Sequence, residues 1–305
     1  MESPNKDLAD ALYKISIYYS ILGDKYRSSA YLSASDSTRN LTEEVTSGAE
    51  AKAAVVSGIG ESIERDIDEF VKTGKISRLD KLKSENPQVE QSLSQLTRIH
   101  GISVKRAVKL YNSGIRSIQD LWDSNLATEN ERLSIVYLLQ LEQRIPRVEM
   151  NYMKSIFNDL WNGIYFEIVG SYRRGLHESS DIDVLVRKDP GVTIDTLVDK
   201  LGDIIKITYA KRTEMFLGVI KIDDLNAHRI DILIIDPQNW YSALLHFTGS
   251  KFFNIRLRSI AKSKGMKLSQ HGLFDIKTGT AYPITSEEDI FNILGQPYLL
   301  PSQRV

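Results

Sequence analysis

The stretch GSYRRGLHESSDIDVLV, residues 170–186, decides the fold of the C-terminal half. A glycine-serine-arginine turn precedes two aspartates, Asp181 and Asp183, at the start of an apolar run. Alternate side chains of a strand share one face, so the two carboxylates point the same way while Ile182 and Val184 point to a core. Neighbouring carboxylates repel each other unless a cation neutralises them or one stays protonated. The stretch therefore predicts a strand with a cation site beside an anion-binding turn.

A third aspartate strengthens this interpretation. Asp231 interrupts the apolar run RIDILII, residues 229–235. Three carboxylates from two strands could hold two Mg²⁺ ions about 3.5–4 Å apart, as in phosphoryl transfer. The turn upstream supplies phosphate ligands, because Gly170 exposes backbone N–H groups, Ser171 offers a hydroxyl and Arg174 a planar fork. The alternative, an exposed aspartate pair at a strand start, is what a bare D-x-D motif would favour.

Composition restricts the class of protein. The 305 residues suffice for two or three domains. No apolar run approaches the length of a membrane helix, and the polar, acidic N-terminus is unlike a signal peptide. The absence of cysteine excludes disulfides and cysteine-ligated zinc, and fits a reducing intracellular compartment, whether nucleus, cytoplasm or virion. Residues 1–80 carry ten basic and fourteen acidic side chains, which argues against strong phosphate binding there.

The hydrophobic pattern changes near residue 150. Before it, apolar residues recur at helical spacing between glycine-containing turns, and the polar segment 81–92 marks a boundary between two helical modules. After it, helices are expected at 152–161, 194–203 and 250–264, and strands at 165–170, 181–186, 204–210, 215–222 and 228–235. The expected fold is α+β, with a helical N-terminal half.

Several motifs together resemble the family X DNA polymerases. GSYRRGLHESSDIDVLV is similar to the family's nucleotidyltransferase signature. Other resembling segments follow the family's order along nearly the whole chain: SGAEAK (47–52), SGIGESIERDIDEFVKTGKISRLDKL (57–82), LTRIHGISVKRAVKLYNSGIRSIQDL (96–121), EQRIPRVEM (142–150), RIDILII (229–235), HFTGSKFFNIRLR (246–258) and LGQPYLLPSQRV (294–305).

The resemblance implies four domains. A lyase-like helical domain with a first helix-hairpin-helix module would span 1–84, and a duplex-binding domain with a second module 85–147. A nucleotidyltransferase palm with a mixed sheet would span 148–240, and a small α+β, nucleotide-binding thumb 241–305.

It also implies the residues of an active site. Asp181 and Asp183 would bind two divalent ions, Mg²⁺ or Mn²⁺, and Asp231 would bind one and draw the proton from a primer 3′-hydroxyl. Residues matching nucleotide-contacting positions are Arg144, Ser171, Arg174, Ser179, Ser180, Phe247, Gly249, Asn254 and Arg258. Two positions depart from the family: Ser180 replaces a glycine, and His246 replaces a tyrosine that helps exclude ribonucleotides.

Backbone N–H groups of the helix-hairpin-helix turns would reach DNA phosphates without reading sequence. The implied DNA contacts are Tyr26, Arg27, Gly58, Gly60, Gly101, Ser103, Lys105 and Arg229. The carbonyls of Thr97, Ile99 and Ile102 would hold a monovalent cation, Na⁺ or K⁺. Ser103 stands where the family has glycine; a helix corner with a solvated basic face is the alternative here.

The first module departs from the family at its lyase chemistry. Family members that remove a 5′-deoxyribose phosphate use a lysine, but Asp66 occupies that position and Ser62 that of a phosphate-binding lysine. A carboxylate cannot form an imine. We expect the lyase to be lost, the alternative being substitution by Lys25, Lys52 or Lys72.

The expected function is therefore template-directed, gap-filling DNA synthesis in repair. The partners would be gapped or nicked duplex DNA and a dNTP, with a monomeric enzyme and no membrane. A non-templated nucleotidyltransferase or terminal transferase is the alternative, disfavoured by the helix-hairpin-helix modules. A third alternative, a non-enzymatic DNA-end scaffold, is disfavoured by the three aspartates.

Overall fold

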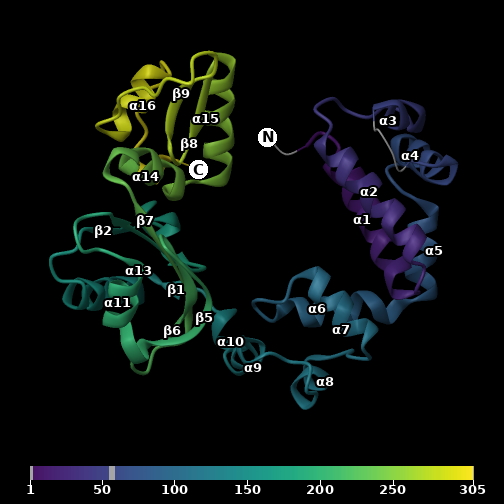
Figure 1. Ribbon diagram of the computed structural model, residues 1–305, viewed down its shortest axis with the longest axis horizontal. Coiled ribbons are helices and arrows are strands. Elements are labelled where there is room, and N and C mark those ends of the chain that lie inside the picture. Colours follow the sequence, from purple (N-terminus) through teal and green to yellow (C-terminus); the bar gives the residue numbers. More distant parts are fainter. Residues whose placement is uncertain (1–2, 55–58, 305) are drawn as a thin grey trace. The chain divides into compact units, whose positions relative to one another are not determined.

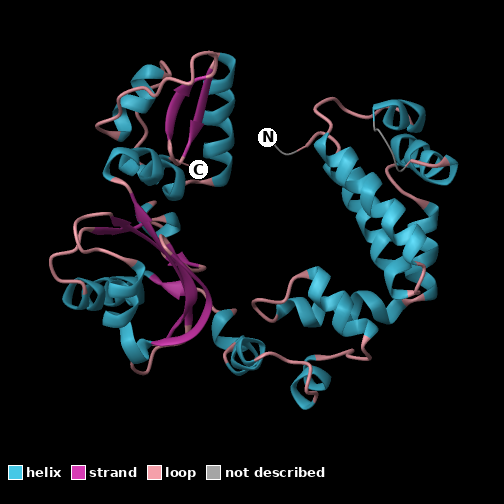
Figure 2. Cartoon of the chain, viewed as in Figure 1, coloured by secondary structure: helices cyan, strands magenta, loops and turns pink. Residues whose placement is uncertain are grey.

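The computed structural model describes residues 3–54 and 59–304. The chain divides into two compact units, Met1–Ile135 and Val136–Val305, which are described separately. The fold class is confirmed: a helical N-terminal part is followed by an α+β part with a mixed sheet (Figure 2). Within the described residues, no helix combines the length and the apolar character that crossing a bilayer requires.

The first unit is built from helices. They are α1 (Lys6–Ile21), α2 (Lys25–Asn40), α3 (Gly48–Ala54), α4 (Glu61–Thr73), α5 (Ser77–Glu85), α6 (Pro87–Arg98), α7 (Val104–Asn112), α8 (Ile118–Asp123) and α9 (Glu129–Val136), the last ending at the junction (Figure 1). The polar segment 81–92 lies within α5 and α6, where Leu82 and Val89 are buried in the core around α1. A second core surrounds α6 and α7, with Leu96 and Leu110 fully buried. The division into four domains stays a prediction.

A five-stranded sheet organises the second unit, in the order β2-β4-β7-β6-β5. Its strands are β2 (Phe166–Ile168), β4 (Ile182–Arg187), β5 (Ile205–Arg212), β6 (Met215–Ile220) and β7 (His228–Ile235). β4 and β7 are parallel and the other pairs antiparallel, which makes the sheet mixed. A separate two-stranded ladder joins β1 (Ile145–Pro146) to β3 (Glu178–Ser179).

The two faces of the sheet differ because side chains alternate along each strand. One face, with Ile182, Val184 and Ile232 inward, packs against α11 (Arg147–Leu160) and α13 (Ile194–Leu201) in the largest core. On the other face, Leu185 packs with residues of α14 (Trp240–Thr248). Asp183 on β4 and Asp231 on β7 lie on this second face, because they alternate with the inward-facing isoleucines.

The C-terminal elements form a small α+β body of their own. They are α14, α15 (Lys251–Ser263), the hairpin β8 (Met266–Ser269) and β9 (Gly272–Asp275), and α16 (Glu287–Ile293). Their core includes Phe253, Leu257, Leu273 and Phe291. The side chain of Ser250 accepts a hydrogen bond from the backbone N–H of Phe253 and so begins α15.

Candidate active site

Two parallel strands bring two of the three predicted carboxylates together. Asp183 on β4 and Asp231 on β7 are direct register partners, and Asp181 immediately precedes β4. The residues that precede Asp183 and Asp231, Ile182 and Ile230, are fully buried on the opposite face. The alternation read from the sequence therefore places the carboxylates on one side of the sheet.

Like charges and burial perturb this cluster. Burial, together with the charges of Asp181 and Asp231, raises the pKa of Asp183 to about 7, against the opposing effects of Arg229 and Arg174. Burial also raises the pKa of Asp231, with Asp181 adding to the shift. The carboxylates thus gather with too little positive charge of their own, which is the electrostatic condition of a cation site.

One cation of the chain already reaches the cluster. Arg229 donates from Nη2 to Oδ2 of Asp181 at 3.0 Å. Within the described ranges, no three His, Cys, Asp or Glu side chains are gathered tightly enough to hold a metal ion. The donor set, three carboxylates, is the oxygen-rich kind that Mg²⁺ and Mn²⁺ prefer. The residues therefore fit divalent ions by chemistry, while Asp181 is turned to Arg229, a residue expected to contact DNA.

The predicted phosphate turn forms a short helix, α12 (Gly170–Arg173), beside the carboxylates. Gly170 has φ +58°, and a Cβ there would lie 2.5 Å from Oδ2 of Asp183, so the backbone approach requires glycine. Ser171 donates to the hydroxyl of Ser179 at 2.8 Å. Arg174 is half-buried and donates to the carbonyl of Thr248 at 2.6 Å.

The β1–β3 ladder brings a second arginine to the same turn. Ile145 pairs with Ser179, which sets the preceding Arg144 beside residues 178–180. Arg144 donates to Glu178 at 3.1 Å and also to the hydroxyl of Ser180. The five residues expected at the triphosphate, which are Arg144, Ser171, Arg174, Ser179 and Ser180, thus come from three short, neighbouring segments.

Sequence reasoning missed an ion network that ties α12 to the C-terminal body. Arg173 donates to Glu287 at 2.8 and 3.1 Å and to the hydroxyl of Thr248 at 2.8 Å. Arg304, which is fully buried, donates to the same carboxylate at 2.6 Å. Burial would raise the pKa of Glu287, but hydrogen bonds from the two arginines lower it below its usual value. No local pattern marks this contact, because its members lie in three distant segments.

The predicted nucleotide-facing residues lie at the junction of α14 and α15. Gly249 has φ +69°, and a Cβ there would lie 3.2 Å from Nη1 of Arg174, which connects this junction to the phosphate turn. Asn254 donates from its side chain to the carbonyl of His246 at 2.7 Å. Arg258 is exposed and donates to Nδ1 of His246 at 3.0 Å. The ring of Phe247 packs partly against the core that also contains Trp240.

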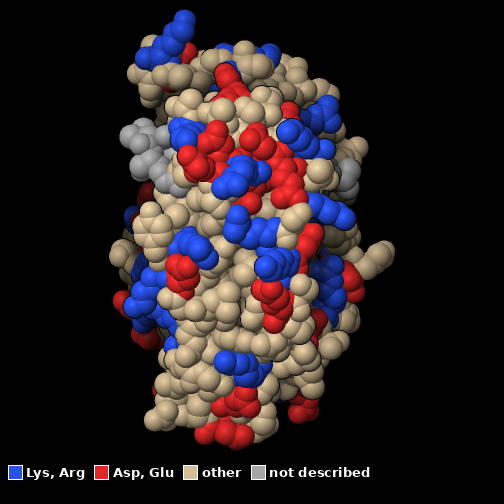
Figure 3. All heavy atoms as spheres, turned by 90° about the vertical axis from the view of Figure 1, so that its right-hand side faces the viewer, with Lys and Arg blue, Asp and Glu red and all other residues tan. Residues whose placement is uncertain are grey.

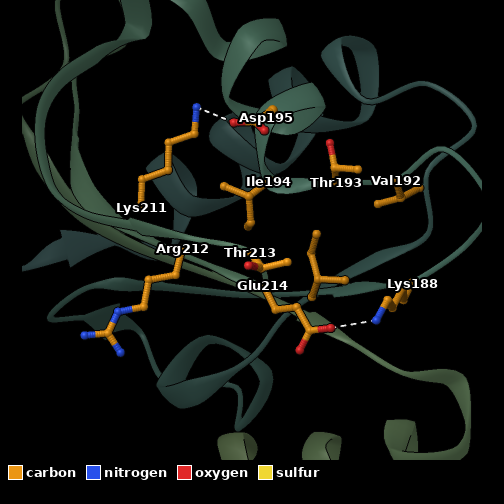
Figure 4. Close-up of a pocket in the computed structure, with 10 residues that line it drawn as sticks. Lys188, Val192, Thr193, Ile194, Asp195, Lys211, Arg212, Thr213 and Glu214 are labelled. Atoms are coloured by element: carbon orange, nitrogen blue, oxygen red, sulfur yellow. Dashed lines mark hydrogen bonds and ion pairs between the residues drawn. The ribbon is translucent and has the colours of Figure 1, made fainter.

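A separate cavity of about 620 Å³ lies elsewhere in the second unit, between α13 and the β5–β6 turn (Figure 4). Two ion pairs cross it, Lys188 with Glu214 at 2.6 Å and Lys211 with Asp195 at 2.5 Å. Its lining includes none of the predicted site residues.

In the first unit, a cavity of about 880 Å³ contains several predicted DNA contacts. Tyr26, Arg27 and Gly60 line it, together with Tyr31 and Ser62. Tyr26 is 85% exposed. Gly58, the remaining predicted contact of this module, lies outside the described residues.

Asp66 lies buried beside this cavity, and the chain itself neutralises it. Arg78 donates to Asp66 at 2.8 Å and to Ser62 at 2.8 Å. Tyr31 also donates its hydroxyl to Asp66. Burial and this contact raise the pKa of Tyr31, so its hydroxyl stays protonated. None of the described residues that line the cavity is a lysine.

Acidic side chains dominate this part of the surface. Figure 3 faces the helical unit and shows them gathered in its upper half, where α3 and α4 lie. Apart from the buried Asp66, the acidic residues of these helices are Glu50, Glu61, Glu64, Asp68 and Glu69. Lys52 lies among these residues and forms an ion pair with Glu64 at 2.9 Å.

The second helix-hairpin-helix turn is formed between α6 and α7. Gly101 has φ +92°, and the N–H of Ile102 donates to the carbonyl of Ile99 at 3.0 Å, while Thr97 lies in the last turn of α6. Ser103 accepts from the N–H of Arg106 and so begins α7; the serine therefore has a structural use that glycine lacks.

Basic residues follow this turn, but they differ in availability. Lys105 is exposed. Arg106 is held by Glu131 through bonds of 2.8 and 3.0 Å, so its charge is already paired within the chain.

Comparison with known proteins independently supports the family resemblance that the sequence motifs indicate. Family models match in three segments: residues 3–76 match a helix-hairpin-helix domain, 144–237 the DNA polymerase beta palm, and 243–305 the DNA polymerase beta thumb.

Whole-chain relatives agree with these matches. DNA polymerase lambda of Rattus norvegicus is 27% identical and that of Arabidopsis thaliana 26%; each alignment covers 98% of this chain, but 56% and 62% of the relative. The DNA polymerase/3′-5′ exonuclease PolX of Bacillus subtilis (strain 168) is 24% identical over 98% of this chain and 54% of its own length. The chain thus spans little more than half the length of these relatives.

Proposed function

We propose that this chain, which belongs to the family X DNA polymerases and resembles DNA polymerase beta, extends a primer 3′-end on a DNA template. The observation that carries the proposal is the register pairing of Asp183 and Asp231 beside the turn of Gly170. The substrates would be a dNTP and gapped or nicked duplex DNA, used in repair by a monomer. The absence of cysteine supports a reducing intracellular compartment.

Each part of the cluster has a defined task in this reaction. Arg144, Ser171 and Arg174 bind the triphosphate, with Ser179 and Ser180 completing the turn. Asp181, Asp183 and Asp231 would hold divalent ions, Mg²⁺ or Mn²⁺, which when bound stabilise the charge that develops on the attacking and leaving oxygens. Asp231 accepts the proton of the primer 3′-hydroxyl.

The duplex would be held by the helical unit. Backbone N–H groups of the turn around Gly101 reach a phosphate, and the carbonyls of Thr97, Ile99 and Ile102 hold Na⁺ or K⁺. Lys105 adds an exposed positive charge. Arg229, by contrast, donates to Asp181 at 3.0 Å, so part of its charge is directed at the carboxylate cluster.

Primer extension tests the proposal. We expect the wild-type chain to fill a one-nucleotide gap, and Asp231→Asn to abolish incorporation while DNA binding is retained. Asp199→Asn is the matched control, since Asp199 is exposed on α13, against the opposite face of the sheet. Equal extension of a single-stranded primer would instead indicate a terminal transferase, and full incorporation by Asp231→Asn would contradict the proposal.

We further propose that the chain lacks 5′-deoxyribose phosphate lyase activity. Asp66 is held by Arg78 and Tyr31, and a Schiff base requires a neutral amine. Glu64 raises the pKa of Lys52 through a hydrogen bond, which keeps that amine protonated. Borohydride reduction in the presence of a 5′-deoxyribose phosphate substrate should trap no adduct; efficient trapping that is lost on replacing Lys25 or Lys72 would contradict this.

A further inference from the structure

His246 and Arg258 form a contact that the reaction described above does not use. His246 lies in the last turn of α14 and is half-buried, while Arg258 is exposed on α15. Nη2 of Arg258 lies 3.0 Å from Nδ1 of His246. The pair therefore joins the two helices at the junction where the new base pair is expected.

The chemistry of the contact fixes the state of the ring. A guanidinium can only donate hydrogen bonds, so Nδ1 must accept one and cannot carry a proton. The bond consequently requires the neutral imidazole with its proton on Nε2. Protonation would remove the acceptor and leave two positive charges in contact.

Residue 246 anchors a second side chain at the same junction. Asn254 donates to the carbonyl of His246 at 2.7 Å, one helical turn before Arg258 on α15. The ring itself is held edge-on against Phe247, with ring centroids 4.8 Å apart. Backbone and side chain of one residue thus orient both polar groups that would face the nascent pair.

We propose that the neutral imidazole of His246 positions Arg258 at the incoming nucleotide and thereby sets the discrimination between correct and mispaired nucleotides. The inference rests on the proposed polymerase function. A guanidinium fixed by one donor offers its remaining N–H groups in one orientation, whereas a released one samples many. Correct pairs, which present a constant geometry, would lose more from that freedom than mispairs.

The surroundings of the ring determine the pH at which the contact opens. Burial lowers the pKa of His246, and the positive charge of Arg258 and His271, from the β8–β9 turn, lowers it further. The neutral form therefore predominates at neutral pH. The bond is lost only as the pH falls through this lowered value, below the usual histidine range.

Four proteins test the inference: wild type, His246→Asn, His246→Phe and the control His271→Asn. An asparagine amide oxygen can lie where Nδ1 lies and accepts without titrating, whereas phenylalanine cannot accept. The measurement is the ratio of kcat/KM for correct and mispaired insertion, taken from neutral pH down through the pH at which the His246 ring becomes protonated. Titration of the aspartates cancels in this ratio, because both insertions use them.

The tautomer is measured separately, by ¹⁵N nuclear magnetic resonance of the histidine rings. This readout does not depend on catalysis. We expect an unprotonated Nδ1 on His246 at neutral pH, and its signal to change on Arg258→Ala.

We expect wild-type discrimination to fall about tenfold as the pH decreases, the size of a lost charged hydrogen bond. His246→Asn should keep the neutral-pH ratio at every pH, and His246→Phe should have a low ratio throughout. His271→Asn should retain the pH dependence, with its midpoint moved to higher pH because a charge that lowers the pKa of His246 is removed. Wild-type discrimination in His246→Phe, or a wild-type pH profile in His246→Asn, would overturn the inference alone. Absence of any incorporation by the wild-type chain would instead overturn the proposed polymerase function.

Discussion

Two buried carboxylate sites in this chain differ in how far the surrounding residues compensate their negative charge. On the sheet, Asp183 is flanked by Asp181 and Asp231, and its pKa is raised to about 7 by burial and by these like charges. In the helical unit, Asp66 is more deeply buried, at 5% exposure, but receives bonds from Arg78 and Tyr31. The first site lacks positive charge, and the second is neutralised by its own fold.

The difference separates a functional carboxylate from a structural one. A buried charge that the chain leaves under-compensated destabilises the fold and persists where a ligand supplies the missing charge. A buried charge with a complete set of partners stabilises the fold only while all partners remain. Removing a carboxylate should therefore have opposite effects on stability at the two sites.

The largest expected effect is on catalysis at the sheet. Asp183→Asn should reduce incorporation about a thousandfold or more, because it removes a carboxylate expected to touch the reacting centre. Without divalent ions, the same variant should unfold at a higher temperature than the wild type, since like-charge repulsion is relieved. Single-turnover incorporation and calorimetry in a chelator measure the two effects. A lower melting temperature in the variant would show that the cluster is not under-compensated.

Replacement of the structural aspartate should act on stability instead. Asp66→Ala leaves Arg78 and Tyr31 without their shared acceptor, which we expect to cost about 2–3 kcal/mol, less than for a fully buried pair because Arg78 is partly solvated. Asp80→Ala, at an exposed position on α5, is the control and should change stability by less than about 0.5 kcal/mol. Urea unfolding of the two variants makes the comparison. Equal, small effects would mean that Asp66 is as dispensable as a surface residue.

The ion pairs of Glu287 test whether a carboxylate with a complete set of partners can also affect nucleotide binding at the active site. Glu287→Gln should destabilise by about 2 kcal/mol at pH 7, since buried Arg304 loses its charged acceptor. The pKa of Glu287 is lowered, so its stabilisation is present above its unfolded-state value and is lost as the pH falls through the lowered one.

The difference in unfolding free energy between the wild type and Glu287→Gln should therefore shrink at acid pH. Urea titrations at several pH values measure it. Because Arg173 shares this carboxylate and precedes Arg174, incorporation should also decrease, with a raised KM for the nucleotide. A constant difference across the acid range would exclude an ionised Glu287 as its source.

Much of the sheet site could be predicted from the sequence, for a physical reason. The alternation in DIDVLV and RIDILII fixes which side chains share a face, and apolar neighbours fix which face is buried, so Asp183 and Asp231 were expected together. The fold class and the positions of the strands along the chain followed from the same patterns and from the family resemblance. The requirement for glycine at 170 also had a local signal, because a turn preceded the strand.

The partners of charged side chains could not be predicted. The pairing of Arg229 with Asp181 depends on the rotamer of a long side chain, and the contact of Arg173 with Glu287 joins segments distant in the sequence. At Asp66 the substitution itself was visible, but its compensation by Arg78 and Tyr31 depends on how three helices pack. Burial follows a regular spacing of apolar residues that can be read from the sequence. Ion pairs between distant segments leave no such spacing.

The smallest expected effect concerns the hydroxyl of Ser103, whose hydrogen-bond partner lies only three residues away in the sequence. Ser103 accepts from the N–H of Arg106 at 3.3 Å, so Ser103→Ala should destabilise α7 by about 1 kcal/mol and Ser103→Gly by only a few tenths. Ser113→Ala, at the other end of α7, is the control and should change stability little. Duplex binding, measured by fluorescence anisotropy, should be preserved in Ser103→Gly, because the backbone N–H groups of the turn remain. If Ser103→Gly and Ser103→Ala both bind DNA more weakly than the wild type, the hydroxyl would contribute to the DNA contact and not only to the helix cap.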